Sequence, residues 1–260
     1  MDLNEIKNAG IGAAYKSAKI LNDYYGRLTH IEKKGPTDLV TDADVASQNA
    51  IIDAIQAKFP DHCILAEENG YDQLNAAECQ WIIDPLDGTT NFAHQIPIFC
   101  ISIAFAAEGR TRVGIVLNPV NGELFTAVEG QGAALNGRPI SVSGQTEISE
   151  SLLVTGFPYA FQAIIQPVMQ RFQQCLQAAR GIRRLGSAAL DLCYVACGRF
   201  EAFWEENLHP WDTAAGTVIV ETAGGRVTDF SGNPFSPDKK EILASNGHIH
   251  EAVRSLLLRI

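Results

Sequence analysis

The sequence predicts a mixed α/β fold, that is, an α+β arrangement in which helices cover mixed sheets. Two helical segments open the chain, short apolar runs separated by turns fill its middle, and strands alternate with helices beyond residue 151. Helices and sheets each have an apolar side that must be buried, and this order of elements buries those sides against one another in layers.

Two helices and two strands are predicted in the first third of the chain. Apolar residues recur at helical spacing over 3–28 and over 43–59, and Pro60 ends the second pattern. A short strand is predicted over 62–66, and the apolar residues 81–83 suit a buried strand. We therefore expect two amphipathic helices, each followed by a strand.

A meander of antiparallel strands is predicted over 96–128. Its apolar runs are separated by turns, and Asn121-Gly122 is a hairpin turn of the favoured kind. A further turn leads to a short strand predicted at 140–142. The apolar stretch 99–117 is expected to form either core or a subunit interface.

A polar connector at 143–151 marks the predicted boundary between an N-terminal domain, 1–145, and a C-terminal domain, 146–260. Beyond it strands and helices alternate. The predicted strands are 152–157, 200–204, 226–230 and 242–245. The predicted helices are 166–179, a segment following Ser187, 211–223 and a last helix at the C-terminal end.

Composition and charge exclude several classes of protein. Apolar residues make up 46% of the chain and charged residues 19%, as in an ordinary globular enzyme. The formal net charge of −10 repels polyanions and argues against direct binding of nucleic acid. No apolar run approaches the roughly 20 residues of a membrane-spanning helix, and no signal peptide is apparent, so we expect a cytoplasmic protein that binds no membrane.

Other residue types suggest structural roles. The six cysteines contain no C-x-x-C pair and mostly lie in apolar stretches, so buried free thiols are expected rather than disulfides or zinc ligands. No His-Glu-x-x-His, Walker lysine loop or nucleophilic serine elbow occurs. The tryptophans are expected in the core, His209 in a partly exposed loop, and His248 and His250 on the surface of the last helix.

The stretch 81–92, WIIDPLDGTTNF, places two acids directly after an apolar strand. Its proline and glycine are expected to hold Asp84 and Asp87 on a tight bend, so that both carboxylates face one point. The backbone carbonyl of Leu86 lies between them. Such a set of hard oxygen donors suits Mg²⁺.

The residues after this bend favour an anion. Gly88, Thr89 and Thr90 are predicted to open a helix whose free N–H groups and positive dipole end attract a group such as phosphate. A cation site and a phosphate site would then adjoin. The alternative is that Asp84 caps this helix and Asp87 is a solvated turn residue.

Acids also follow two other strand–helix junctions. Glu67 and Glu68 end a separate strand, and Asp212 stands at the start of a predicted helix. Ligands in layered α/β proteins collect at such junctions, so these acids are expected to meet Asp84 and Asp87. Bound cations would hold them together, because unpaired like charges repel. For Glu68 a solvent-facing position is the alternative.

A further acidic patch comprises Thr41, Asp42 and Asp44. It is typical of a helix N-cap, with Thr41 or Asp42 as the capping residue. A catalytic interpretation is compatible with this one. A hydroxyl such as that of Thr89, hydrogen-bonded to Asp44, could accept a proton from an attacking water.

Four motifs together resemble the inositol monophosphatase family, in particular its bacterial members, and the similarity extends over nearly the whole chain. The motifs are DLVTDAD (38–44), LAEENG (65–70), DPLDGTTNF (84–92) and PWDTAAG (210–216). The resemblance implies a layered αβαβα sandwich, similar to fructose-1,6-bisphosphatase. It also implies hydrolysis of phosphate monoesters with two or three Mg²⁺ ions, inhibition by Li⁺, and a homodimer.

The resemblance also implies roles for individual residues. The first Mg²⁺ would be held by Glu67, Asp84, the carbonyl of Leu86 and Thr89. The second would be held by Asp84, Asp87 and Asp212, with Glu67 and Asp44 near a third, weaker ion. Catalysis would depend on Asp44, Glu67 and Thr89. The substrate side would be lined by Glu67, Asp87, Gly88, Thr89, Thr90, Gly186, Ser187, Ala188, Glu205 and Asp212.

The resulting hypothesis is a Mg²⁺-dependent phosphatase for inositol monophosphate, with Glu205 contacting a polyol hydroxyl. Alternative substrates are fructose-1,6-bisphosphate, histidinol phosphate and adenosine 3′,5′-bisphosphate. Arg183 and Arg184 would then either reach a second phosphate or form a solvated basic pair. A hypothesis from another class is a regulatory role with a protein partner, since the family's bacterial members include proteins of transcription-linked assemblies.

Overall fold

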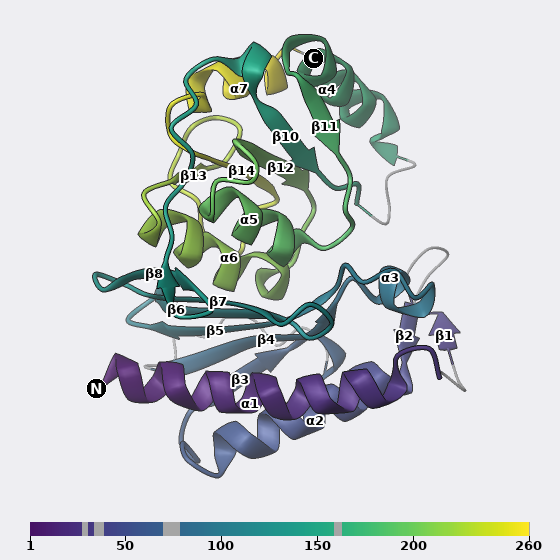
Figure 1. The fold of residues 1–260 in the computed structure, drawn as a ribbon, viewed down its shortest axis with the longest axis vertical. Coiled ribbons are helices and arrows are strands. Elements are labelled where there is room, and N and C mark those ends of the chain that lie inside the picture. Colours follow the sequence, from purple (N-terminus) through teal and green to yellow (C-terminus); the bar gives the residue numbers. More distant parts are fainter. Residues whose placement is uncertain (28–30, 34–38, 70–78, 159–162, 260) are drawn as a thin grey trace.

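The chain folds into five layers, helix–sheet–helix–sheet–helix, as Figure 1 shows. This computed structural model describes residues 1–27, 31–33, 39–69, 79–158 and 163–259. The mixed α+β class predicted from the order of elements is confirmed, as is the αβαβα sandwich that the resemblance implied.

Helices α1 (Leu3–Tyr24) and α2 (Asp42–Gln56) form the first outer layer. Both were expected from the spacing of apolar residues, and each ends slightly earlier than predicted. Ile6 and Leu21 belong to the apolar stripe of α1 and are almost completely buried in the core between this layer and the sheet. The amphipathic pattern therefore fixes which side of each helix faces inward.

The second layer is a seven-stranded sheet whose strands lie in chain order. They are β3 (Cys63–Ala66), β4 (Cys79–Asp87), β5 (Cys100–Ala107), β6 (Arg110–Asn118), β7 (Glu123–Val128), β8 (Gly132–Leu135) and β9 (Arg138–Pro139). β3 and β4 are parallel, and the later neighbours are antiparallel. The predicted meander is confirmed.

Two details of this region differ from the expectations. Residues 140–142 form no strand of their own: β9 ends at Pro139, the Ile140 N–H still donates to the Ala133 oxygen, and the Val142 N–H then donates to the Ala223 oxygen instead of to the sheet. The stretch 99–117 is core rather than interface, since Phe99 and Leu117 are at most 1% exposed within a single chain. A small antiparallel pair, β1 (Ile31–Lys33) and β2 (Leu39–Thr41), is too short to predict from a pattern.

The middle layer consists of α5 (Ala188–Ala196) and α6 (Pro210–Thr222), which lie between the two sheets (Figure 1). Both helices are buried nearly all round. A Cβ atom on Gly114 of β6 would lie 2.5 Å from the backbone oxygen of Ala215. Glycine at this point therefore lets α6 approach the first sheet closely.

The fourth layer is a five-stranded mixed sheet, and the fifth consists of α4 (Ile165–Ala178) and α7 (His250–Leu257). The strand order is β11 (Gly181–Arg183), β10 (Leu152–Thr155), β12 (Ala202–Glu206), β14 (Glu241–Ser245) and β13 (Arg226–Thr228). β10 is parallel to both its neighbours, and β14 is antiparallel to both of its own. The predicted strands and helices of this half are confirmed with shifted ends, and β11 is additional.

Single-residue expectations have mixed outcomes. The tryptophans are core residues, each at most 6% exposed, and all six cysteines are free thiols. Cys63 is exposed, however, and not buried. His250 is fully buried, so its predicted surface position is wrong; its ring is hydrogen-bonded to Thr228 and Ser245. His248 is exposed as predicted.

Across the described ranges, no helix combines the length and apolar character needed to cross a membrane. The two larger sheets precede and follow the polar connector 143–151 in the chain. Because α6 of the second half packs closely on β6 of the first, the division into domains 1–145 and 146–260 stays a prediction.

Candidate active site

A cavity of about 610 Å³ collects almost all the predicted site residues. Its lining includes Glu67, Asp84, Leu86, Asp87, Gly88, Thr89, Thr90, Gly186, Ser187, Ala188, Glu205 and Asp212. Asp44 does not line the cavity but accepts a hydrogen bond from Thr89. Glu67 and Asp212 therefore meet Asp84 and Asp87 at one place, whereas Glu68 is half-buried and does not line the cavity.

Asp84 and Asp87 are presented by a bulge within β4. The strand continues through both acids instead of ending before them, and its pairing with β5 shifts between them. Asp84 lies opposite Ser102 and Asp87 opposite Cys100, so β4 carries one extra residue here. The predicted tight bend is thus a bulge, which turns both carboxylates toward the cavity.

The alternative structural roles of these two acids are wrong. Gly88, with φ +94°, is the N-cap residue of α3 (Thr89–Ala93) and makes no side-chain cap bond. Asp84 instead accepts a hydrogen bond from the Leu86 N–H at 2.9 Å. Asp87 is only 8% exposed and therefore is not a solvated turn residue.

Asp87 anchors the start of α5. Its Oδ2 atom accepts hydrogen bonds from the Ser187 hydroxyl at 2.7 Å and from the Ala189 N–H at 2.8 Å. The Cys100 thiol adds a longer contact at 3.6 Å. One carboxylate oxygen is thereby saturated with donors, which fixes the orientation of the other.

Asp212 is held by the first turn of α6. Its Oδ2 accepts a hydrogen bond from the His209 N–H at 2.6 Å, as in a capping box, and Pro210 occupies the first helical turn. The His209 ring stacks on Trp211 with centroids 4.8 Å apart. The sequence signals that start this helix therefore also place the acid.

The predicted N-cap and catalytic interpretations of Thr41 and Asp44 are geometrically compatible. Thr41 caps α2, and Asp44 accepts hydrogen bonds from its N–H and hydroxyl, which completes a capping box. The Thr89 hydroxyl lies 3.1 Å from Asp44 Oδ1 and 3.0 Å from the Leu86 oxygen. Burial raises the pKa of Asp44 to about 6, opposed by the bonds from Thr41.

The electrostatics of the cavity reflect its concentration of acids. Burial raises the pKa of Asp84 well above its ordinary value, and the nearby charges of Glu67, Asp87 and Asp212 raise it further. The pKa of Asp212 is raised by burial and then by Asp87 and Glu67. Within the described residues no lysine or arginine forms an ion pair with Asp84, Asp87 or Asp212.

The donor set fits a hard cation. It offers carboxylate oxygens, a backbone carbonyl and a hydroxyl, the ligands that Mg²⁺ prefers. In the part of the chain that the structure describes, no group of three or more His, Cys, Asp or Glu side chains is placed so that it could hold a metal ion as it stands. Oxygens of Asp84, Asp87 and Asp212 are instead engaged by backbone N–H groups.

Glu205 lies at the side of the cavity formed by β12. It is 7% exposed, and burial raises its pKa to about 8, with Arg184 acting in the opposite direction. A Cβ atom on Gly156 would lie within 2.3 Å of the Glu205 carboxylate, so this glycine makes room for it.

Sequence reasoning missed one acid of the cavity, Asp191 of α5. The signal that could have found it is a single acid within the apolar helix 188–196. The two predicted basic residues differ in position. Arg184 is exposed and lines the cavity, whereas Arg183 does not line it.

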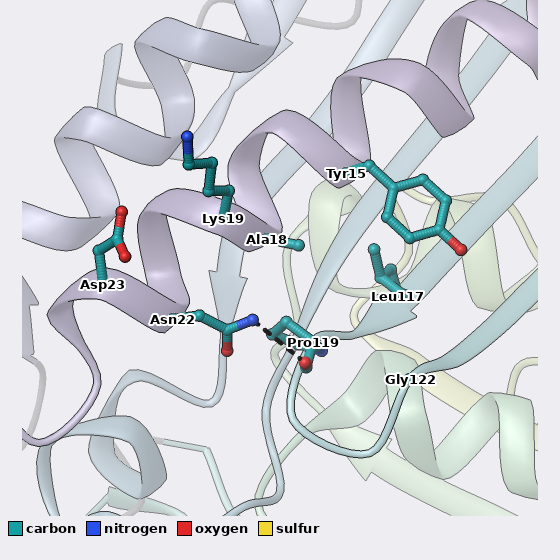
Figure 2. Close-up of a pocket in the computed structure, with 8 residues that line it drawn as sticks. All are labelled: Tyr15, Ala18, Lys19, Asn22, Asp23, Leu117, Pro119 and Gly122. Atoms are coloured by element: carbon teal, nitrogen blue, oxygen red, sulfur yellow. Dashed lines mark hydrogen bonds between the residues drawn. The ribbon is translucent and has the colours of Figure 1, made fainter.

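A second hollow, of about 370 Å³, lies along the chain's first helix. Figure 2 shows Tyr15, Lys19 and Asn22 of α1 beside the turn that follows β6, where Asn22 donates a hydrogen bond to the Pro119 oxygen. None of the predicted site residues lines it.

The layered fold is that of a class of known phosphatases. The solved inositol monophosphatase from Anabaena (Nostoc) sp. PCC 7120 has a TM-score of 0.91 at 40% sequence identity, covering 100% of this chain and 98% of that one. The IMPase of Thermotoga maritima has a TM-score of 0.89 at 38% identity, covering 99% and 97%.

The sequence profile of the inositol monophosphatase family matches residues 2–259, and the chain therefore belongs to this family of phosphatases. It is 45% identical over 235 residues to an inositol-1-monophosphatase of Synechocystis sp., covering 90% of this chain and 82% of that protein. It is 42% identical over 257 residues to a protein named Nus factor SuhB from Haemophilus influenzae, covering 98% and 96%.

Proposed function

We propose that the protein is a Mg²⁺-dependent phosphomonoesterase that hydrolyses inositol monophosphate to inositol and phosphate. The observation that carries the proposal is the convergence of Glu67, Asp84, Asp87 and Asp212 on one cavity that also contains Glu205. Burial and the neighbouring acids raise the pKa of Asp84 and of Asp212, and divalent cations would supply positive charge to this group.

The proposed metal ligands follow the family pattern. Glu67, Asp84, the Leu86 carbonyl and Thr89 would hold one ion. Asp84, Asp87 and Asp212 would hold a second, with Glu67 and Asp44 near a third. Bound Mg²⁺ supplies positive charge for the phosphoryl group and lowers the pKa of the attacking water.

The chain's own residues would position water and substrate. The Thr89 hydroxyl donates toward Asp44 or the Leu86 carbonyl, which leaves its oxygen lone pairs to accept a hydrogen bond from water. Asp44 would then take up the proton. Backbone at 88–90 and 186–188 would bind the phosphate, and Glu205 a hydroxyl of the polyol. Positioning of this kind is the main contribution that phosphoryl transfer requires from a protein.

The direct test is phosphate release from inositol 1-phosphate with Mg²⁺, with a chelator, and with Li⁺ added. We expect turnover only with Mg²⁺ and competition by Li⁺. Asp87→Asn should reduce kcat at least about a hundredfold, because it removes the charge of a metal ligand. Its Tm without metal should not fall below that of the wild type, since the amide can keep the bond from Ser187 to its carbonyl oxygen. Wild-type turnover by Asp87→Asn would refute the assignment.

Other small esters remain alternatives within this class. A panel of inositol 1-phosphate, fructose-1,6-bisphosphate, histidinol phosphate and adenosine 3′,5′-bisphosphate separates them by kcat/KM. Buried Glu205 favours a substrate that offers hydroxyl donors. A preference for the nucleotide would replace inositol monophosphate as the proposed substrate.

A regulatory role is the second candidate, supported by the SuhB-named relatives at 40–42% identity. A protein partner would then bind the surface independently of the cavity. Pull-down with the wild type and Asp87→Asn, each with and without chelator, tests this. Partner capture that survives both treatments would favour the regulatory role. A homodimer in the cytoplasm belongs to the leading proposal, and light scattering of the purified protein tests the dimer.

A further inference from the structure

Asp191 is the most unusual acid of the cavity. Its side chain is 1% exposed, and both carboxylate oxygens are buried without a hydrogen-bond partner. It projects from α5 in the middle layer and lines the same cavity as Asp87 and Glu205. Asp84, Asp87 and Asp212, which are predicted to hold metal, each accept a hydrogen bond from a backbone N–H group. Asp191 accepts none.

Packing does not account for this residue. A buried carboxylate without a partner loses its hydration and gains nothing in return, so it destabilises the fold. The neighbours of Asp191 on α5 are apolar and buried, and a leucine would suit such a position better. A residue that costs stability at the wall of a cavity is a candidate for a role in binding.

The groups around Asp191 define what it could bind. Burial raises its pKa well above the ordinary value, the charges of Glu205 and Asp87 raise it further, and Arg184 opposes them. Arg184 is exposed, lies 5.8 Å from the Phe157 ring centre, and makes no hydrogen bond among the described residues. Its side chain can therefore turn aside when a ligand enters.

We infer that Asp191 is a specificity residue which, beside Glu205, accepts hydrogen bonds from adjacent hydroxyl groups of a polyol. The inference rests on the proposed phosphatase function and narrows its substrate to phosphate esters of compounds with neighbouring hydroxyls. A carboxylate presents two oxygens side by side, which matches two hydroxyls on neighbouring carbons. Substrate binding thus satisfies acceptors that the free protein leaves unpaired.

Hydroxyl donors fit this end of the cavity better than charged groups do. A second phosphate carries acceptor oxygens and would leave the unpaired acceptors of Asp191 unsatisfied. An ammonium group on the substrate would compete with Arg184 for Asp191 and Glu205, because Arg184 already brings positive charge close to both. Hydroxyl groups are neutral donors, and moving them into a buried site costs less than moving a charge.

The test compares two substrates in three proteins. Asp191→Leu and Asp191→Asn are assayed against inositol 1-phosphate and against p-nitrophenyl phosphate, which offers no hydroxyl to this end of the cavity. For Asp191→Leu we expect KM for inositol 1-phosphate to rise about tenfold or more, from the loss of two hydrogen-bond acceptors. The KM for p-nitrophenyl phosphate should change less than about twofold. Asp191→Asn keeps one acceptor oxygen and should lie between.

Thr217→Val is the matched control. Thr217 on α6 is also buried with an unpaired oxygen but does not line the cavity, so its replacement should leave the ratio of the two KM values unchanged. Thermal unfolding gives a second readout. Asp191→Leu should unfold at or above the wild-type temperature, because it removes a buried polar group that has no hydrogen-bond partner.

Binding of myo-inositol, followed by ligand-observed NMR, separates this inference from the proposed reaction. Binding to the wild type and not to Asp191→Leu supports the polyol site even if no ester is hydrolysed. Four outcomes would each overturn the inference about Asp191. They are an equal loss of activity toward both substrates, an unchanged ratio of the two KM values, equal binding of inositol by wild type and Asp191→Leu, and a preference for histidinol phosphate that is lost in Asp191→Leu. Absence of any phosphatase activity with intact, Asp191-dependent inositol binding refutes the proposed function alone.

Discussion

His250 shows how one buried side chain couples folding to pH. Its ring is fully buried between the hydroxyls of Thr228 and Ser245, and burial, helped by the charge of Arg226, lowers its pKa from 6.5 to about 4. The unfolded chain therefore takes up a proton near pH 6.5, whereas the folded protein does not until about pH 4. The stability contributed by the neutral ring is present above pH 6.5 and is lost as pH falls toward 4.

We expect the free energy of unfolding to fall by about 2 kcal/mol between pH 7 and pH 5 because of this residue. Urea denaturation of the wild type and of His250→Gln at both pH values measures the contribution, which should be absent in the variant. His248→Gln is the control, since His248 is exposed. An identical pH dependence in wild type and His250→Gln would contradict the account.

Single residues also mark the limits of sequence-based prediction. Asp84 and Asp87 were predictable because their flanking proline and glycine restrict the backbone in a recognisable way. The bulge that presents them was not, because it depends on how β4 pairs with β5. The burial of His250 and of Asp191 likewise depends on which elements pack around them, and no local pattern encodes that.

At the scale of elements, the contact between α6 and β6 positions the site. Asp212 is in the first turn of α6, and Gly114 allows the helix to lie directly on the strand. Gly114→Ala would place a Cβ atom 2.5 Å from the Ala215 oxygen, which is backbone and cannot turn aside. We expect a loss of stability of about 1–3 kcal/mol, measured by urea denaturation, with reduced phosphatase activity as α6 shifts.

Gly12→Ala provides the comparison for this glycine. Gly12 is exposed on α1, and an added Cβ would meet nothing within 4 Å. Alanine favours helices, so this change should stabilise the protein by about 0.5–1 kcal/mol. If both alanine variants were equally stable, close packing of α6 on the sheet would not be the reason for Gly114.

The helices and strands differed in how clearly the sequence predicted them. The helices α1 and α2 have an apolar stripe, and the meander has regular turns, so both were predicted. α6 is buried nearly all round and has no stripe, and its Pro-Trp-Asp start was the usable signal. β1, β2 and β11 have only three residues each, which is too few to establish a period.

At the scale of the whole molecule, the cavity gathers like charges from both halves of the chain. Glu67, Asp84 and Asp87 belong to the first half, and Glu205 and Asp212 to the second. Their mutual repulsion opposes closure of the layers onto one another, so ions that bind between them should stabilise the fold as a unit. This coupling follows from the arrangement of the layers and was not accessible from any single motif.

Thermal unfolding with increasing Mg²⁺ tests this coupling without relying on turnover. Ion concentrations about 100 times the dissociation constant should raise the free energy of unfolding by about 2.7 kcal/mol, with a corresponding rise in Tm that a chelator reverses. Asp212→Asn removes one of the repelling charges and one proposed ligand. Its metal-free form should therefore unfold at a higher temperature than metal-free wild type, yet respond less to Mg²⁺.

Asp53→Asn separates this effect from the general consequence of removing one negative charge. Asp53 is exposed on α2 and does not line the cavity, so its variant should keep both the wild-type Tm without metal and the full response to Mg²⁺. A metal-free Asp212→Asn protein less stable than metal-free wild type would mean that the capping bond to His209 outweighs the repulsion. An undiminished Mg²⁺ response in that variant would show that Asp212 does not hold an ion, and the second metal site would have to be reassigned.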